Sequence, residues 1–207
     1  MSASTPAPTA SATLREVSGL PGTLPRLAES TLIMIDFQNT YRSGVMALEG
    51  AEQALAAGAR LLAAARAAGI PVVHVVNDGG EGTPYDIRAE IGAISPEVAP
   101  LEGEPVVVKQ VPNAFQATEL EKTLQQLGAG PDLVIAGFMT HMCVTFTAQG
   151  AFNLGYRPAV VAEATATRTL TAPDGTLVPA AVLQAASLTT IADLFAPVAL
   201  TVDSLPA

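Results

Sequence analysis

The sequence is poor in cysteine, histidine and basic residues. It has one cysteine and two histidines in 207 residues, and ten Lys and Arg against nineteen Asp and Glu give a net charge of −9. One cysteine excludes a disulfide within the chain and fits a reducing compartment, so we expect a cytoplasmic protein. Nucleic acid and anionic membranes need a basic patch that this charge does not supply. The longest apolar run, residues 61–65, is far below the roughly 18 residues of a membrane span.

The apolar content indicates a folded chain with one domain. Hydrophobic residues make up 49% of the sequence and the mean hydropathy is +0.39, which excludes general disorder. Residues 1–28 are rich in Ser, Thr, Pro and Ala and lack the basic start and apolar stretch of a signal peptide. We therefore predict a flexible or wrapping arm over 1–28 and one domain over 29–207.

From residue 31 onward, short apolar runs alternate with helical patterns. The predicted strands are 31–35, 71–76, 106–109, 133–136, 158–162 and 197–201. Their apolar residues are consecutive, which is typical of parallel strands covered on both faces. We predict a three-layer αβα fold of the α/β class, with a doubly wound, mainly parallel sheet of about six strands. Ligands of such folds bind at the carboxyl ends of the strands.

The helical patterns predict four helices between these strands. Apolar residues repeat at three- and four-residue steps over 51–65 and again over 144–155. Thr118 and Glu121 predict a capping box at the start of another helix. Pro179 predicts the first turn of the last helix, where its missing N–H is not needed.

Three polar residues follow apolar runs where the strands are expected to end. Asp36 follows the first strand, Lys109 ends the third, and Cys143 comes shortly after the fourth. A thiol near a helix start and an ammonium group is stabilised as thiolate, and a carboxylate beside it can move the proton. Taken singly, each residue has an equally good structural interpretation: a buried small side chain, a solvated strand end, or a turn former. Their coincidence at one sheet edge favours nucleophilic catalysis.

Three segments resemble the isochorismatase-like cysteine hydrolase superfamily. They are TLIMIDFQNTY (31–41), EPVVVKQVPNAF (104–115) and AGFMTHMCVTFTAQGAFNLGY (136–156), and the similarity extends from about residue 30 to the C-terminus. The resemblance also implies a homo-oligomer, a dimer or tetramer, in which a neighbouring subunit helps to form the pocket.

The same resemblance implies a catalytic triad and its surroundings. Asp36 would be the proton acceptor, Lys109 the electrostatic support and Cys143 the nucleophile. A cis peptide bond would join Phe138 and Met139, and the backbone N–H groups of Met139 and Cys143 would form an oxyanion hole. We therefore predict a hydrolase that cleaves a C–N bond of a small amide, ureide or lactam through a thioester intermediate.

The two histidines do not predict a metal site. Nicotinamidases of this superfamily carry an Asp-x-His motif, and no histidine follows Asp36 here. His74 lies within an apolar strand, so we expect a core histidine hydrogen-bonded to backbone. We therefore predict activity without a metal or any other cofactor.

Residues around the three segments are candidates for contact with the substrate. We do not count Asn39 and Glu163 as candidates. Asn side chains commonly form hydrogen bonds with the backbone of their own turn, and Glu163 stands where the family often has an Asp, in what we expect to be a structural contact. The loop 165–176 is a lid, a subunit contact or a plain surface loop. The candidates for substrate binding are Gln38, Tyr41, Asn113, Phe115, Phe138 and His141.

Two other functions remain open from the sequence. Isochorismatases, which cleave a vinyl ether, resemble this chain around Asp36 and Lys109 but need no thiol, so Cys143 favours carbonyl chemistry. Alternatively, the protein is a non-catalytic thiol redox or ligand-sensing module, although no second cysteine is present to resolve an oxidised thiol.

Overall fold

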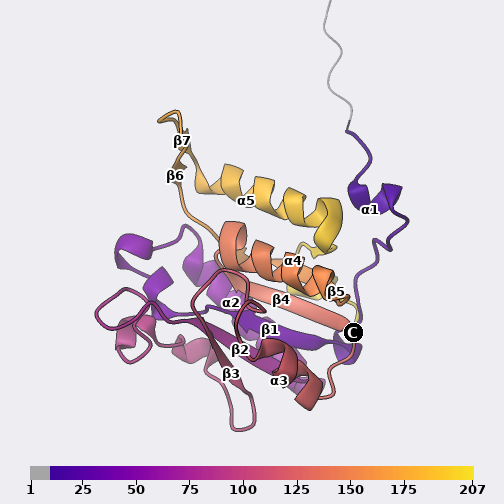
Figure 1. The fold of residues 1–207 in the computed structure, drawn as a ribbon, viewed down its shortest axis with the longest axis horizontal. Coiled ribbons are helices and arrows are strands. Elements are labelled where there is room, and N and C mark those ends of the chain that lie inside the picture. Colours follow the sequence, from indigo (N-terminus) through magenta and orange to yellow (C-terminus); the bar gives the residue numbers. More distant parts are fainter. Residues whose placement is uncertain (1–9) are drawn as a thin grey trace, which may run out of the picture.

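The computed structural model describes residues 10–207, so the first nine residues of the predicted arm lie outside the described part of the chain. A six-stranded parallel sheet lies at the centre, in the order β3-β2-β1-β4-β5-β8 (Figure 1). Its strands are β1 Thr31–Ile35, β2 Val72–Asn77, β3 Val106–Lys109, β4 Asp132–Phe138, β5 Arg157–Ala166 and β8 Val198–Ala199. The predicted fold class and the six-stranded sheet are confirmed.

The strand order creates a topological switch point between β1 and β4. From β1 the chain proceeds to one side through β2 and β3, and β4 then returns to the other side of β1. Connections leave such a point in opposite directions, which opens a crevice at the carboxyl ends of the strands. Asp36 follows β1 directly and Cys143 lies shortly after β4, so both residues flank the switch point.

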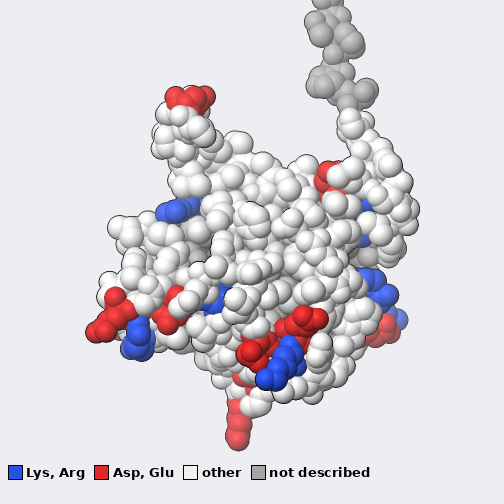
Figure 2. Space-filling view, in the orientation of Figure 1, with Lys and Arg blue, Asp and Glu red and all other residues white. Residues whose placement is uncertain are grey.

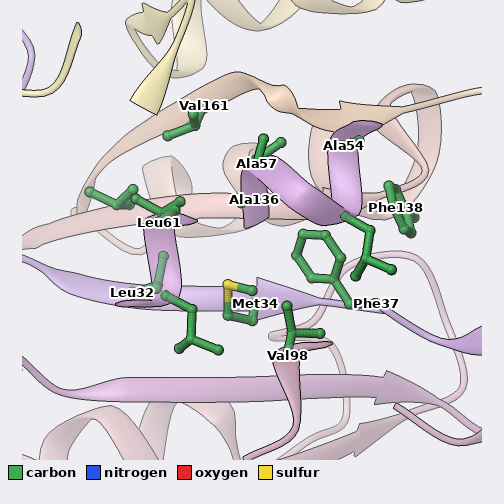
Figure 3. Close-up of a cluster of buried hydrophobic side chains, with 14 of the residues drawn as sticks. Leu32, Met34, Phe37, Ala54, Ala57, Leu61, Val98, Ala136, Phe138 and Val161 are labelled. Carbon is green, nitrogen blue, oxygen red and sulfur yellow. The ribbon is translucent and has the colours of Figure 1, made fainter. Parts of the chain in front are cut away.

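Helices cover both faces of the sheet. One face packs against α2 (Ala51–Ala67), and the other packs against α3 (Leu120–Gln126) and α4 (Thr145–Asn153), with α5 (Ala180–Thr190) beside α4 (Figure 1). Figure 3 shows the core under α2, where Leu61 and Phe37 meet side chains of the sheet such as Met34. Among residues 10–207, no helix is both long enough and apolar enough to cross a membrane.

Local details differ from three of the sequence-based predictions. Strand β3 is at the edge of the sheet and is covered on one face only, so Val106 and Val108 are each 45% exposed. The predicted capping box is wrong, because α3 has Glu119 and not Thr118 at its N-cap. The Thr118 hydroxyl accepts a hydrogen bond from the Leu120 N–H and donates one to the Ala114 carbonyl in the preceding loop. Pro179 occupies the N-cap of α5, one position before the predicted first turn.

The predicted loop 165–176 is largely a β-hairpin. Its first residues extend β5, and the short strands β6 (Leu170–Thr171) and β7 (Leu177–Val178) then pair antiparallel. The hairpin projects from the body of the molecule (Figure 1), and Figure 2 shows acidic residues at its tip. Asp174 in the turn accepts hydrogen bonds from the backbone N–H and the hydroxyl of Thr176. Its role as a lid or a subunit contact stays a prediction.

The described part of the N-terminal segment is tied to the C-terminal part of the chain. Its short helix α1 (Leu14–Val17) lies near residues 191–195, with the Leu14 N–H donating to Asp193 and the Arg15 guanidinium to the Leu194 carbonyl. Further on, the Leu27 N–H donates to the Pro206 carbonyl. These bonds draw the segment along the outside of the domain.

Candidate active site

The carboxyl ends of four neighbouring strands bring the candidate catalytic residues together. Asp36 follows β1, Asn77 ends β2 and Lys109 ends β3, with Asn77 and Lys109 aligned in the parallel register. Cys143 lies in a π-helical turn, Thr140–Val144, between β4 and α4. Turns of this type are frequent at functional sites because they re-aim one side chain out of the regular helix.

Lys109 is at the centre of this group. Its Nζ lies 2.7 Å from Asp36 Oδ2, 3.2 Å from Cys143 Sγ and 3.2 Å from Asn77 Oδ1. The side chains of Asp36 and Lys109 are fully buried, while Cys143 keeps 7% of its surface exposed. The structure therefore brings the three predicted residues together and adds Asn77, which the sequence analysis did not single out.

The backbone around Asp36 is held in an unusual conformation. Asp36 has a φ of +51°, a left-handed value that is costly for most side chains, and its N–H donates to the Val75 carbonyl over 2.8 Å. Gln38 fixes the following turn: its side-chain amide donates to the carbonyls of Gly92 and Asn77 and accepts from the Asn77 N–H. The predicted substrate ligand Gln38 is thus fully buried with its polar groups bonded to backbone.

The chain between β4 and Cys143 is also tightly constrained. Gly137 has a φ of +136°, and a Cβ there would come within 1.9 Å of the Ile35 carbonyl oxygen, so this close contact with β1 requires glycine. The Phe138–Met139 peptide bond is cis, as the family resemblance implies. The amides on either side of Cys143, those of Met142 and Val144, both donate to the Met139 carbonyl.

Burial and charge determine the resting protonation of the site. Burial, reinforced by the Asp36 carboxylate, raises the pKa of Cys143 to about 12, and Lys109 offsets only part of this effect. The expected resting thiolate is therefore wrong, because desolvation outweighs the ammonium group. Burial also raises the pKa of Asp36 against the pull of Lys109. For Lys109, burial acts to lower the pKa, but the charge of Asp36 and the hydrogen bonds to Asp36 and Cys143 outweigh it and raise the pKa.

Aromatic side chains pack beside the buried charges. The Tyr41 ring meets Phe138 edge-on at 5.5 Å and Tyr85 at 5.8 Å between centroids. Tyr41 thus lies against Phe138, which precedes the cis peptide bond, and Tyr85 lies next to Tyr41. Burial raises the pKa of Tyr41 and of Tyr85, and Asp36 and Cys143 act on both in the same direction. Tyr85 belongs to the connection between β2 and β3, and no sequence pattern indicated its role.

His141 and Arg168 form a second polar group near Cys143. The His141 Nδ1 lies 2.5 Å from the Thr167 hydroxyl. Burial lowers the pKa of His141, and the neighbouring positive charge of Arg168 lowers it further. Thr167 and Arg168 directly follow β5 and belong to the loop 165–176, which the sequence indicates as a lid, a subunit contact or a surface loop but not as part of the reaction site.

Two other predicted substrate ligands lie elsewhere. Asn113 accepts from the Phe115 N–H and packs so closely against α4 that a Cβ on Gly150 would come within 2.4 Å of its side chain. Phe115 stacks on Tyr156 at 5.9 Å, beyond the C-terminal end of α4, whereas Cys143 precedes the N-terminal end. The nine residues of α4 span about 13 Å, so Tyr156 and Cys143 lie at opposite ends of this helix. The geometry therefore gives both residues packing roles, and it leaves Tyr41, Phe138 and His141 near the site.

His74 and Glu163 take part in structural contacts. His74 is buried, but it bonds the Glu104 carboxylate at 3.0 Å, so the expected bond to backbone is wrong. Glu163 accepts from the Val202 N–H and pairs with Arg60. Within residues 10–207, no three His, Cys, Asp or Glu side chains are grouped so that they could hold a metal ion.

Known proteins resemble the chain in both sequence and structure. The model of the isochorismatase domain matches residues 30–203. The crystal structure of an isochorismatase from Pseudomonas putida KT2440 superposes with a TM-score of 0.90 and 41% identity, covering 95% of this chain and 100% of that one. The isochorismatase family protein YddQ of Bacillus subtilis is 40% identical over 73% of this chain and 84% of its own length. Ureidoacrylate amidohydrolase RutB of Stutzerimonas stutzeri is 32% identical over 68% of this chain and 71% of its own length. The chain therefore belongs to the isochorismatase family, a family of hydrolases with amidohydrolase members.

Proposed function

We propose that the protein is a metal-independent cysteine hydrolase that cleaves a C–N bond of a small amide, ureide or lactam through a thioester. The observation that carries this proposal is the position of Lys109, whose ammonium group contacts both the Asp36 carboxylate and the Cys143 sulfur. This is the arrangement needed to hold a base and a nucleophile together in a buried site. The amidohydrolase among the similar proteins supports the same class of reaction.

The first step is attack by Cys143 on the substrate carbonyl. Because the thiol is neutral at rest, its proton moves to Asp36 as the C–S bond forms, and the raised pKa of Asp36 helps it to accept that proton. The negative charge that develops on the carbonyl oxygen is bound by the backbone N–H groups of Met139 and Cys143. Lys109 stays charged and stabilises the anionic form of both partners.

The second step returns the proton and releases the products. Asp36 donates its proton to the leaving nitrogen as the C–N bond breaks, which leaves an acyl group on the Cys143 sulfur. The carboxylate then takes a proton from water, and the resulting nucleophile cleaves the thioester. The Cys143 sulfur recovers its proton, so the enzyme returns to its starting state without any cofactor.

The same geometry argues against a redox-sensing role. Oxidant-sensing cysteines are exposed and have a low pKa. Cys143 is 7% exposed, its pKa is raised to about 12, and it is the single cysteine of the chain. A neutral, buried thiol can act as a nucleophile when a base removes its proton during the attack, but it does not react readily with oxidants.

The test is a panel of primary amides, ureides and lactams assayed with the wild type, Cys143→Ala and Cys143→Ser. We expect at least one compound to be hydrolysed, activity to fall on the order of 1,000-fold or more in both variants, and EDTA to have no effect. A mass increase of one acyl group on the wild type, absent in Cys143→Ala, would identify the thioester. Turnover that survives in Cys143→Ala, or that is lost with EDTA and restored by a metal, contradicts the proposal.

A further inference from the structure

A cavity lies between the N-terminal segment and the amino ends of the strands. Its volume is about 510 Å³, which is within the range of binding sites for small molecules. Asp132 and Arg157, the first residues of β4 and β5, are part of its lining. The seven residues of β4 span about 20 Å, and Asp36 and Cys143 lie at the carboxyl ends of the strands. The cavity is therefore separate from the proposed reaction site.

The lining of the cavity is rich in aromatic and other apolar side chains. The body of the domain contributes Phe152, near the end of α4, and Phe195, and these two rings meet edge-on at 6.0 Å between centroids. Tyr156 adds a third ring, and the N-terminal segment contributes Leu20 and Pro21. Aromatic rings pack favourably against other rings, either edge-on or offset. The lining therefore favours a ligand whose body is a flat aromatic ring system.

The charged residues of the lining leave one positive charge unpaired. Three arginines and two acidic residues line the cavity. The Arg157 Nε donates to Asp132 Oδ1 over 2.8 Å, and the Arg26 Nε lies 3.6 Å from Glu29 Oε1. The third arginine, Arg15, donates to two backbone carbonyls instead. The lining thus carries one cation that no carboxylate within residues 10–207 neutralises.

Arg15 has lost hydration without gaining a counter-ion. Its side chain is half-buried, and its guanidinium donates to the carbonyls of Leu194 and Pro21. The Arg15 Nε is shielded from solvent and has no acceptor in the described part of the chain. Burial lowers the pKa of Arg15 as a result. An anion that enters the cavity stabilises this guanidinium, because it supplies the missing negative charge in a partly desolvated place.

We propose that this cavity is a second binding site, which takes a small aromatic anion such as an aromatic carboxylate. The rings of Phe152 and Phe195 pack against the body of the ligand, and Arg15 supplies the positive charge that attracts its anionic group. Arg15 belongs to the N-terminal segment and Phe195 to the body of the domain, so a ligand between them holds the segment in place. The inference does not depend on the proposed hydrolysis, because the two sites lie at opposite ends of the sheet.

The first experiment measures binding with two fluorescent probes that have the same rings. 8-Anilinonaphthalene-1-sulfonate is an anion, and N-phenyl-1-naphthylamine is its neutral counterpart. We expect the sulfonate to bind at one site per chain and about five- to tenfold more tightly than the neutral probe. Arg15→Gln should reduce this ratio to about 1, and Arg15→Lys should keep most of it. Phe195→Ala should weaken both probes, because both use the aromatic wall. Naphthalene-1-carboxylate should displace the sulfonate.

Two control variants remove a positive charge elsewhere. Arg60→Gln removes an exposed arginine on α2, on the other face of the sheet, and should leave the binding of both probes unchanged. Lys109→Met removes the buried cation of the proposed reaction site and should likewise leave the sulfonate bound. Circular dichroism shows whether each variant is folded.

The second experiment follows the N-terminal segment itself. Trypsin cleaves after Arg15 and Arg26, which both line the cavity, and after Arg88, which is 57% exposed and lies outside it. We expect the sulfonate to slow cleavage after Arg15 and Arg26 about fivefold or more and to leave cleavage after Arg88 unchanged. Mass spectrometry of the fragments separates the three sites, and the Arg88 site also reveals any effect of the probe on trypsin.

Three results would overturn the assignment. The first is equal affinity of the two probes for the wild type, or a preference for the sulfonate that persists in Arg15→Gln. The second is loss of the sulfonate in Lys109→Met, which would place the probe at the reaction site. The third is an affinity for the sulfonate that falls as the protein associates at higher concentration, which would show that a second copy of the chain covers the cavity.

Discussion

Two carboxylates lie at opposite ends of the β2–β3 strand pair, and their pKa values are shifted in opposite directions. Glu104, just before β3, accepts hydrogen bonds from Arg66 at 2.7 Å, His74 at 3.0 Å and the Leu101 N–H at 2.9 Å. These contacts, those of Arg66 above all, lower the pKa of Glu104 to about 2 despite partial burial. Asp36, beside the carboxyl ends, is fully buried, and burial raises its pKa.

The difference lies in how completely each carboxylate is satisfied. Asp36 is compensated by its ion pair with Lys109 and by the Cys143 thiol, which together do not offset the effect of burial on its pKa. A carboxylate with a complete set of hydrogen-bond partners is stabilised in its charged form, and this stabilises the folded state. A buried carboxylate with few hydrogen-bond partners accepts a proton readily, which is what a general base needs. The two ends of one strand pair thus serve stability and reactivity separately.

The largest expected effect is that of Asp36→Asn on turnover. The amide keeps the shape of the side chain and removes the proton acceptor, so kcat/KM should fall about 100- to 10,000-fold. The pKa of Cys143 should fall at the same time, because the carboxylate contributes to raising it. Steady-state kinetics and a titration of thiolate absorbance, with Cys143→Ala as the blank, check the two effects. A variant with near-normal turnover shows that Asp36 is not the base.

At the other end of the strand pair, Glu104→Gln should affect stability and leave turnover within a few fold of the wild type. It removes charged hydrogen bonds to Arg66 and His74, so we expect the free energy of unfolding to fall by about 1.5–3 kcal/mol. Urea denaturation followed by circular dichroism measures this change. A large loss of turnover in a variant of normal stability would contradict the separation of the two clusters.

The pH dependence of that stability sharpens the comparison. Glu104 has a pKa of about 2 when folded and an ordinary value of 4.5, so it stabilises the folded state fully above about pH 4.5. The contribution is lost as the pH falls from 4.5 towards 2, because the unfolded chain then binds the proton first. Denaturation of the wild type and of Glu104→Gln should therefore converge in this range. Curves that stay equally far apart would show that the contribution of Glu104 is not electrostatic.

Lys109→Met tests whether the ammonium group of Lys109 lowers the pKa values of Asp36 and Cys143. Without the ammonium group, the pKa values of both residues should rise, because Lys109 lowers each of them. The base must be ionised to accept a proton, so the acidic limb of the pH–rate profile should move to higher pH. The measurement is kcat/KM against pH for the variant and the wild type. A profile that does not move, together with an inactive Asp36→Asn, would make Lys109 a purely structural residue.

The sequence predicts where the triad lies more reliably than it predicts the surroundings of the triad. Parallel strands end at one edge, so a polar residue after each apolar run is sufficient to place Asp36 and Lys109 together. The thiolate prediction for Cys143 was wrong because its pKa depends on burial, which is a property of the assembled site. Tyr85 and Arg168 come from connections whose paths follow no periodic pattern, and Phe115, expected at the site because it follows Lys109 in the sequence, stacks on Tyr156.

We expect the smallest effect from breaking the Lys122–Glu119 ion pair. This pair tests whether contact distance or burial determines the strength of an ion pair. Lys122 Nζ lies 2.9 Å from Glu119 Oε2, close to the 2.7 Å that separates Lys109 from Asp36, yet both side chains are about two-thirds or more exposed, at 67% and 72%. Water screens such a pair and the two long side chains lose freedom in forming it. Glu119→Gln should therefore leave the urea midpoint, the turnover and the pH–rate profile unchanged. If this variant destabilised the protein as much as Glu104→Gln, contact distance rather than burial would determine the effect of each pair, and the contrast between the two ends of β2 and β3 would have to be abandoned.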